Sequence, residues 1–150
     1  MIKRIILPAF AAALLFGLNG APGSSAPESD PIQKLKTTTS FCGAHTGFAG
    51  VKGASYLAYE QALKEGAKIR KGLDDVLVNG SPAGRLYAAM LIRKLDKDAG
   101  DKALKSLLSE KAEVDYCLGG CGIIKYTVGE AAKQLLSHTS DPLSDQAAGE

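Results

Sequence analysis

The chain has 150 residues, of which 18 are lysine or arginine and 16 are aspartate or glutamate, so its formal net charge is +2. Residues of opposite charge are interspersed, as in the stretch from Lys94 to Asp98, which is typical of a solvated surface. Nucleic-acid-binding proteins need a basic surface that neutralises phosphates, so the charge pattern excludes that class.

The N-terminus has the pattern of an export signal. Lys3 and Arg4 precede an uncharged apolar run from Ile5 to Leu18, and small residues follow. The run is shorter than the about 20 residues that a bilayer-spanning helix needs, which favours a cleaved signal over an uncleaved anchor. We therefore expect residues 1–26 to be a signal peptide and the protein to be exported, either periplasmic or extracellular. After cleavage the basic and acidic residues balance, and no second segment is apolar enough to span a membrane.

The rest of the chain divides into three parts. Residues 27–40 are rich in proline, serine and threonine, so we expect a flexible leader. Residues 140–150 end polar and acidic, so we expect a disordered tail. Residues 41–139 contain the periodic apolar segments and are predicted to form one small helical domain with a modest core.

The domain is predicted to be all-α, with about five helices. Apolar residues recur at helical spacing from Ser55 to Glu65 and on both sides of the turn at Asn79–Pro82. A fourth helix is expected after Asp101, which can cap it. The last helix begins with a capping box, in which Thr127 bonds the amide of Glu130 and the Glu130 side chain bonds back.

The clearest pattern is a helical hairpin from Ile69 to Leu95. Gly80 can end its first helix, Ser81 can cap the second, and Pro82 stands at the first helical position. With Arg85 three residues on and an alanine-rich helix behind it, this order resembles a HEAT repeat. The resemblance implies a short HEAT-like stack of antiparallel helix hairpins, in which Arg85 is a structural brace between helices.

One position departs from the HEAT pattern. The residue before the arginine is usually aliphatic, and here it is Gly84. A glycine there would either let another backbone come close or leave the helix start loose.

The chain also resembles a loose group of small exported bacterial proteins with HEAT-like helices. The likeness rests on a Gly-Phe-Ala-Gly segment at Gly47–Gly50, a Pro-x-x-Arg-x-Tyr-Ala core at Pro82–Ala88, and Gly120-Cys121 before the last helix. It implies fold and export and no particular activity.

Two glycine-rich segments interrupt the helical plan. Gly43–Gly50 could be taken for a phosphate cradle, but it lacks the Lys-Ser/Thr pair of a P-loop, so we expect a turn-rich irregular segment. The stretch Glu113–Tyr126 is either irregular or a short extended hairpin around Gly119-Gly120. No true sheet is expected.

The three cysteines are the reactive candidates. In an oxidising compartment we expect one structural disulfide that includes Cys121, and Cys117 is a better partner than Cys42 because flexible glycines lie between them. The alternative is a Cys₃His zinc site formed by Cys42, His45, Cys117 and Cys121. Apart from that alternative, no metal is expected.

The sequence carries no pattern for nucleophilic catalysis, since it lacks a Gly-x-Ser-x-Gly elbow and has only two histidines. We expect no enzymatic activity and no cofactor. Solenoid-like helix pairs expose a concave face built from their second helices, which usually binds peptides or proteins. The favoured function is an exported binding or structural module with an unidentified protein or peptide partner and no nucleic acid. The alternative is a small metal- or thiol-dependent protein that uses the four candidate zinc ligands.

Overall fold

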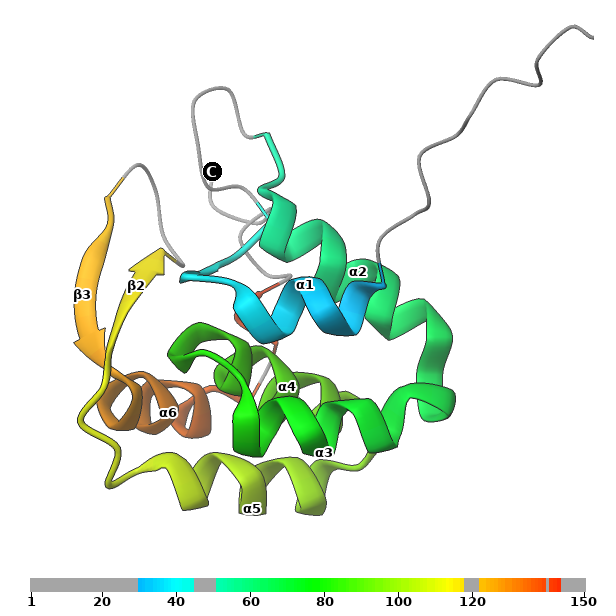
Figure 1. Ribbon diagram of the computed structural model, residues 1–150. Helices are drawn as coiled ribbons and strands as arrows, with labels where there is room; N and C mark the ends of the chain where they lie inside the picture. The colour runs from blue at the N-terminus through cyan, green and yellow to red at the C-terminus, as the bar shows by residue number, and fades with distance from the viewer. Residues whose placement is uncertain (1–29, 45–50, 118–121, 140, 144–150) are drawn as a thin grey trace, which may run out of the picture.

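In the part of the chain that the structure describes, five helices surround a sixth, and a small sheet lies at one end of them (Figure 1). The computed structural model describes residues 30–44, 51–117, 122–139 and 141–143. In chain order the elements are α1 (Pro31–Thr37), β1 (Ser40–Cys42), α2 (Ala54–Glu65), the 3-10 turn η2 (Gly66–Ile69), α3 (Arg70–Asn79), α4 (Pro82–Leu95), α5 (Lys97–Leu107), β2 (Glu113–Cys117), β3 (Ile124–Thr127) and α6 (Val128–Ser137).

The central element is α4. Ser81 caps it by accepting a hydrogen bond from the Gly84 amide at 3.1 Å, and Pro82 stands at its first position, as predicted. Every residue from Leu86 to Ile92 is at most 1% exposed, so this helix is apolar on all sides rather than along one stripe. A helix of that kind must be covered all round, and α1, α2, α3, α5 and α6 all pack against it.

The segment predicted as a flexible leader is in part a packed helix, so the domain starts before residue 41. Asp30 caps α1 by accepting a hydrogen bond from the Ile32 amide at 2.9 Å, and Pro31 occupies the first helical position. Ile32 and Leu35 are both buried. Two apolar residues are too few to show a helical period in the sequence, but both face the core.

Gly84 lies where α1 meets α4. A Cβ atom at this position would overlap the carbonyl oxygen of Leu35 and lie 3.0 Å from Ser81 Oγ. Of the two alternatives for Gly84, the structure therefore shows the first, the close approach of another backbone.

Replacing this glycine should weaken the contact between the two helices. We expect Gly84→Ala to lower the free energy of unfolding by about 1–3 kcal/mol, the usual cost of overpacking, because the α1 backbone must move away. Gly122→Ala is the matched control, since a Cβ there meets nothing within 4 Å, and it should stay within about 0.5 kcal/mol of the parent, as is usual for surface changes. Urea denaturation of both variants measures the difference. Equal losses would mean that α1 does not pack on α4 at this point.

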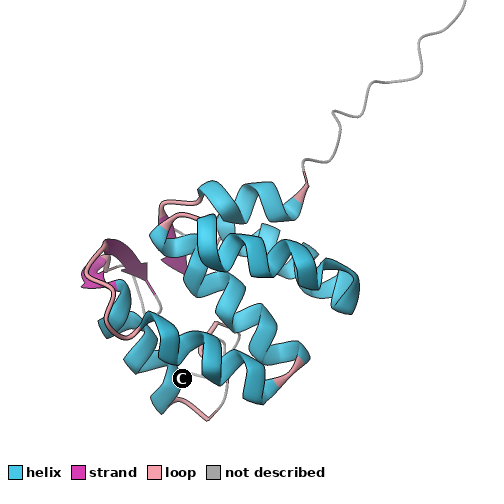
Figure 2. Cartoon of the chain, turned by 60° about the horizontal axis from the view of Figure 1, so that its bottom comes forward, coloured by secondary structure: helices cyan, strands magenta, loops and turns pink. Residues whose placement is uncertain are grey.

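A three-stranded sheet corrects the all-α prediction. β1 pairs with β2 in parallel, with Phe41 opposite Tyr116, and β2 pairs with β3 antiparallel, with Val114 opposite Tyr126. The strands lie together at one side of the helices (Figure 2). The extended hairpin, one of the two alternatives for Glu113–Tyr126, is therefore correct, and its residues 118–121 lie outside the described ranges. The five predicted helices are present as α2 to α6.

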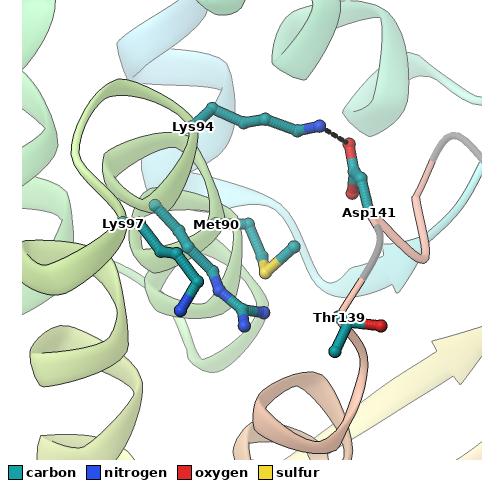
Figure 3. Close-up of a pocket in the computed structure, with 6 residues that line it drawn as sticks. Met90, Lys94, Lys97, Thr139 and Asp141 are labelled. Atoms are coloured by element: carbon teal, nitrogen blue, oxygen red, sulfur yellow. Dashed lines mark ion pairs between the residues drawn. The ribbon is translucent and has the colours of Figure 1, made fainter.

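Part of the predicted disordered tail belongs to the domain. Leu143 is fully buried, and its carbonyl accepts a hydrogen bond from the Ala44 amide at 3.2 Å. Asp141 accepts a hydrogen bond from the Tyr59 hydroxyl at 3.3 Å and pairs with Lys94, whose Nζ lies 2.8 Å away (Figure 3). Side chains from α2 and α4 therefore hold this segment in place.

The remaining predicted segments cannot be compared with the structure. The predicted signal peptide, residues 1–26, lies outside the described residues, as do residues 45–50, 140 and 144–150. None of the described helices has the length and apolar character needed to cross a membrane.

Candidate functional site

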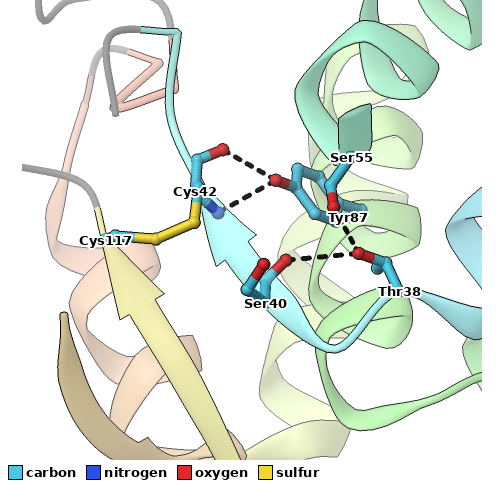
Figure 4. Close-up of a disulfide and its surroundings, with 6 residues drawn as sticks. All are labelled: Thr38, Ser40, Cys42, Ser55, Tyr87 and Cys117. Atoms are coloured by element: carbon cyan, nitrogen blue, oxygen red, sulfur yellow. Dashed lines mark hydrogen bonds between the residues drawn. A yellow bond between two sulfur atoms is a disulfide. The ribbon is translucent and has the colours of Figure 1, made fainter. Parts of the chain in front are cut away.

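A disulfide joins the two parallel strands. Cys42 ends β1 and Cys117 ends β2, and the strand register places them opposite each other with their Cα atoms 4.5 Å apart (Figure 4). This bond corrects the predicted pairing of Cys117 with Cys121. The parallel register, which no local pattern shows, brings together two cysteines 75 residues apart. Cys121 lies outside the described residues.

The bond also bears on the alternative zinc site. Zinc is ligated by cysteine thiolates, and the disulfide leaves neither Cys42 nor Cys117 with a thiol. His45, like Cys121, is outside the described residues. Within the part of the chain that the structure describes, no group of three or more His, Cys, Asp and Glu side chains could hold a metal ion.

Tyr87 fixes the strand that carries the first cysteine. Its hydroxyl donates a hydrogen bond to the Cys42 carbonyl at 2.7 Å and accepts one from the Cys42 amide at 2.9 Å (Figure 4). Its ring packs on Phe41, with centroids 4.6 Å apart. One α4 side chain therefore satisfies both backbone groups of Cys42 and closes the outer edge of β1 there.

Burial keeps the phenols at this junction neutral. It raises the pKa of Tyr116 to about 12, and it also raises the pKa of Tyr59 and of Tyr87 well above the ordinary value. The Tyr87 hydroxyl therefore keeps the proton that it donates to Cys42.

Arg85 bridges two turns of the helical layer. Its Nε donates a hydrogen bond to the Gly80 carbonyl at 2.9 Å, between α3 and α4. Its Nη1 pairs with Glu110, after the end of α5. Arg85 therefore ties the turn between α3 and α4 to the segment after α5.

Thr127 and Glu130 form the capping box of α6. The Glu130 amide donates to Thr127 Oγ1 at 3.2 Å, and the Thr127 amide donates to Glu130 Oε2 at 2.8 Å. The amide and hydroxyl of Thr127 lower the pKa of the Glu130 carboxyl. This box fixes where β3 stops and α6 starts.

The described strand order leaves two edges of the sheet without a partner strand, the outer edges of β1 and β3. Tyr87 bonds the Cys42 backbone at the β1 edge, so the β3 edge is the more open of the two. The Val128 amide bonds the Ala112 carbonyl across the hairpin at 2.8 Å. Bonded and non-bonded pairs alternate along an antiparallel ladder, so Tyr126 and Ile124 also bond to β2. The backbone N–H and C=O of Lys125 therefore point away from the sheet.

Apolar side chains stand beside this edge. Ile123 is 69% exposed and Ile124 is 55% exposed. The Lys125 side chain leans back across the hairpin, with Nζ 3.2 Å from Asp115 Oδ1. We call the segment Ile123–Lys125, with its outward backbone groups, the β3 edge. It combines unpaired main-chain groups with exposed apolar side chains, which is the combination that can add an extended peptide to a sheet.

The concave face expected from the second helices is not open in the structure. α4 is the second helix of the predicted hairpin, and α1, α5 and α6 cover the faces that such a surface would need. The binding surface expected from the HEAT resemblance is therefore replaced by the β3 edge as the candidate site.

Comparison with known proteins finds no matching family model, no similar curated protein and no similar solved structure.

Sequence reasoning missed both Tyr87 as a backbone partner and the β3 edge. The signal for the edge was present: two isoleucines next to glycine and lysine, in a segment that alternates from Ile124 to Thr127. No local signal pointed to the role of Tyr87, because its partner in β1 lies 45 residues earlier in the chain.

Proposed function

We propose that this chain is an exported, HEAT-like binding module without enzymatic activity, and that it holds an extended segment of a partner protein against the β3 edge. The partner strand would bond the outward N–H and C=O of Lys125. Its apolar side chains would cover Ile123 and Ile124. Main-chain hydrogen bonds supply affinity in such complexes, and side-chain contacts supply selectivity.

The observation that carries this proposal is the exposure of Ile123 and Ile124 at an unpartnered strand edge. Exposed apolar residues scattered singly need no explanation. Two consecutive exposed apolar residues beside free main-chain groups can pair with another chain, and proteins usually protect such an edge with charges, bulges or coverage. A binding role gives a reason for this edge to be kept open.

Two further features support the proposal. Disulfides persist in oxidising compartments, so the Cys42–Cys117 bond fits an exported protein. The β3 edge also rests on a rigid base, since β2 is tied to β1 by that bond and α6 is fixed by its capping box.

Site-specific photocrosslinking in the cell that makes the protein tests the proposal. A photoreactive benzoylphenylalanine in place of Ile123 should give one discrete adduct in the exported protein. The matched control is Val78 on α3, which is 70% exposed and should give none. The partner segment mapped from the adduct, made as a synthetic peptide, should bind the purified chain. Adducts of the same kind at both positions, or a mapped peptide that does not bind, would defeat the proposal.

A further inference from the structure

The β3 edge has two different sides. Residues that stand directly opposite each other in neighbouring strands point to the same side of a sheet. Tyr126 stands opposite Val114, and Ile124 stands opposite Tyr116 in the next pair but one. Both of these β2 residues are buried, so Tyr126 and Ile124 continue the apolar side of the sheet outward. Tyr126 is half-buried and Ile124 is 55% exposed, so this side reaches solvent at the β3 edge.

The apolar side ends in an aromatic ring. The Tyr126 ring meets the Tyr116 ring edge to face, with centroids 5.0 Å apart and an angle of 87° between the ring planes. Tyr116 packs in turn on Phe41 at 5.7 Å, and Phe41 packs on Tyr87 of the central helix α4. The rings thus form a series from the core to the edge of the sheet. Tyr126 is the last ring of that series within the described residues, and its contact with Tyr116 fixes its position.

The other side of the edge is charged, and its charges are already paired. Lys125 stands opposite Asp115, and its Nζ lies 3.2 Å from Asp115 Oδ1 and 4.0 Å from Glu113 Oε2. One lysine thus faces two carboxylates, so another acid on this side would add a third negative charge. Another lysine or arginine would stand directly beside Lys125, where like charges destabilise a sheet. A partner residue on this side is therefore best neutral.

We infer that the partner segment at the β3 edge has the pattern apolar–neutral–apolar, with an aromatic residue beside Tyr126, an inference that rests on the proposed function. A strand that bonds the Lys125 backbone places the residue beside Lys125 on the charged side. Its two neighbours lie on the apolar side, next to Tyr126 and Ile124, in either strand direction, because side chains alternate along a strand. An aromatic pair contributes beyond the area that it buries, which makes Tyr126 a specificity-determining residue.

Three short peptides test the pattern on the full chain. Their central residues are Phe-Thr-Phe, Leu-Thr-Leu and Phe-Glu-Phe, each flanked by Gly and Ser, and binding is followed by NMR at the Lys125 amide. Phe-Thr-Phe should bind saturably and tightest. Leu-Thr-Leu should bind about three- to tenfold more weakly, the value of an aromatic pair, and Phe-Glu-Phe should also be weaker because of its added negative charge.

Tyr126→Leu separates contact with the peptide from a structural role. This variant should lose the preference for Phe-Thr-Phe and keep the parent's affinity for Leu-Thr-Leu. The matched control is Tyr56→Leu, the same change on α2 away from the sheet edge, which should keep the preference. Circular dichroism and the disulfide of both variants are checked against the parent.

Four results would overturn the inference: no saturable binding of Phe-Thr-Phe, equal affinity of the parent for the first two peptides, a tighter complex with Phe-Glu-Phe, or an undiminished preference in folded Tyr126→Leu. The photocrosslink at position 123 is independent of these peptides and judges the proposed function separately. A discrete adduct whose mapped segment binds the chain but lacks the pattern would overturn this inference and leave the proposed function standing.

Discussion

Removal of the Cys42–Cys117 bond is expected to lower the free energy of unfolding by about 4 kcal/mol, because a cross-link that closes a long loop removes much of the entropy of the unfolded chain. The two cysteines are 75 residues apart, so the loop includes most of the described domain. For a protein of this size such a loss is a large share of the total stability.

The double variant Cys42→Ala, Cys117→Ala should show this loss in urea denaturation without reductant. Its helical circular dichroism at room temperature should change little, because the helices are held mainly by the buried α4. The control is Cys121→Ala, which should keep both the bond and the stability. A peptide map that links Cys117 to Cys121, or a loss in the control as large as in the double variant, would contradict the observed pairing.

Leu91→Ala should have the second largest effect, about 2–5 kcal/mol, the range for truncating a fully buried leucine. Leu91 is 1% exposed and lies one turn after Tyr87 on α4, as the sequence predicts. The central place of α4 means that the cavity would be surrounded by packed helices, which cannot easily collapse into it.

A leucine of the same domain that is half exposed provides the comparison. Leu57 on α2 is 50% exposed, so Leu57→Ala should stay within about 0.5 kcal/mol of the parent, as is usual for surface changes. Thermal or urea unfolding of the two variants gives both values. A loss at Leu91 as small as that at Leu57 would mean that α4 is not the core helix.

The local signals in the sequence account for most of the helical layer. Helical periodicity predicted α2 to α6, because each helix carries enough apolar residues to show its period. Ser81, Pro82 and the Thr127–Glu130 box fixed two helix starts, because capping acts within a few residues. Gly84 was recognised as unusual, although only the structure shows that α1 is the neighbour it admits.

The parts that were missed depend on contacts between distant segments. The strands are only three to five residues long, so alternation is at best a weak signal in them. β1 joins the sheet through a parallel pairing with a strand more than 70 residues later. That pairing places Cys42 opposite Cys117 and so determines which cysteines form the disulfide. The ties of Asp141 to Tyr59 and Lys94, and the choice of Asp96 over Asp101 as a cap, likewise depend on packing that no local pattern reveals.

The proposed binding mode depends on one backbone group more than on any side chain. The Lys125 amide points away from β2, so proline can replace this residue without loss of a hydrogen bond within the sheet. Lys125→Pro removes the outward N–H that a partner strand would need, and Lys125→Ala keeps it while making the same change in charge.

The most direct measurement is the yield of the adduct from benzoylphenylalanine at position 123 in these two backgrounds, with the disulfide and the circular dichroism of each checked against the parent. We expect Lys125→Pro to lower the yield about tenfold or more, since the partner is left with an unpaired acceptor, and we expect Lys125→Ala to keep it. An adduct that persists at full yield in a folded Lys125→Pro chain would contradict strand addition at the β3 edge.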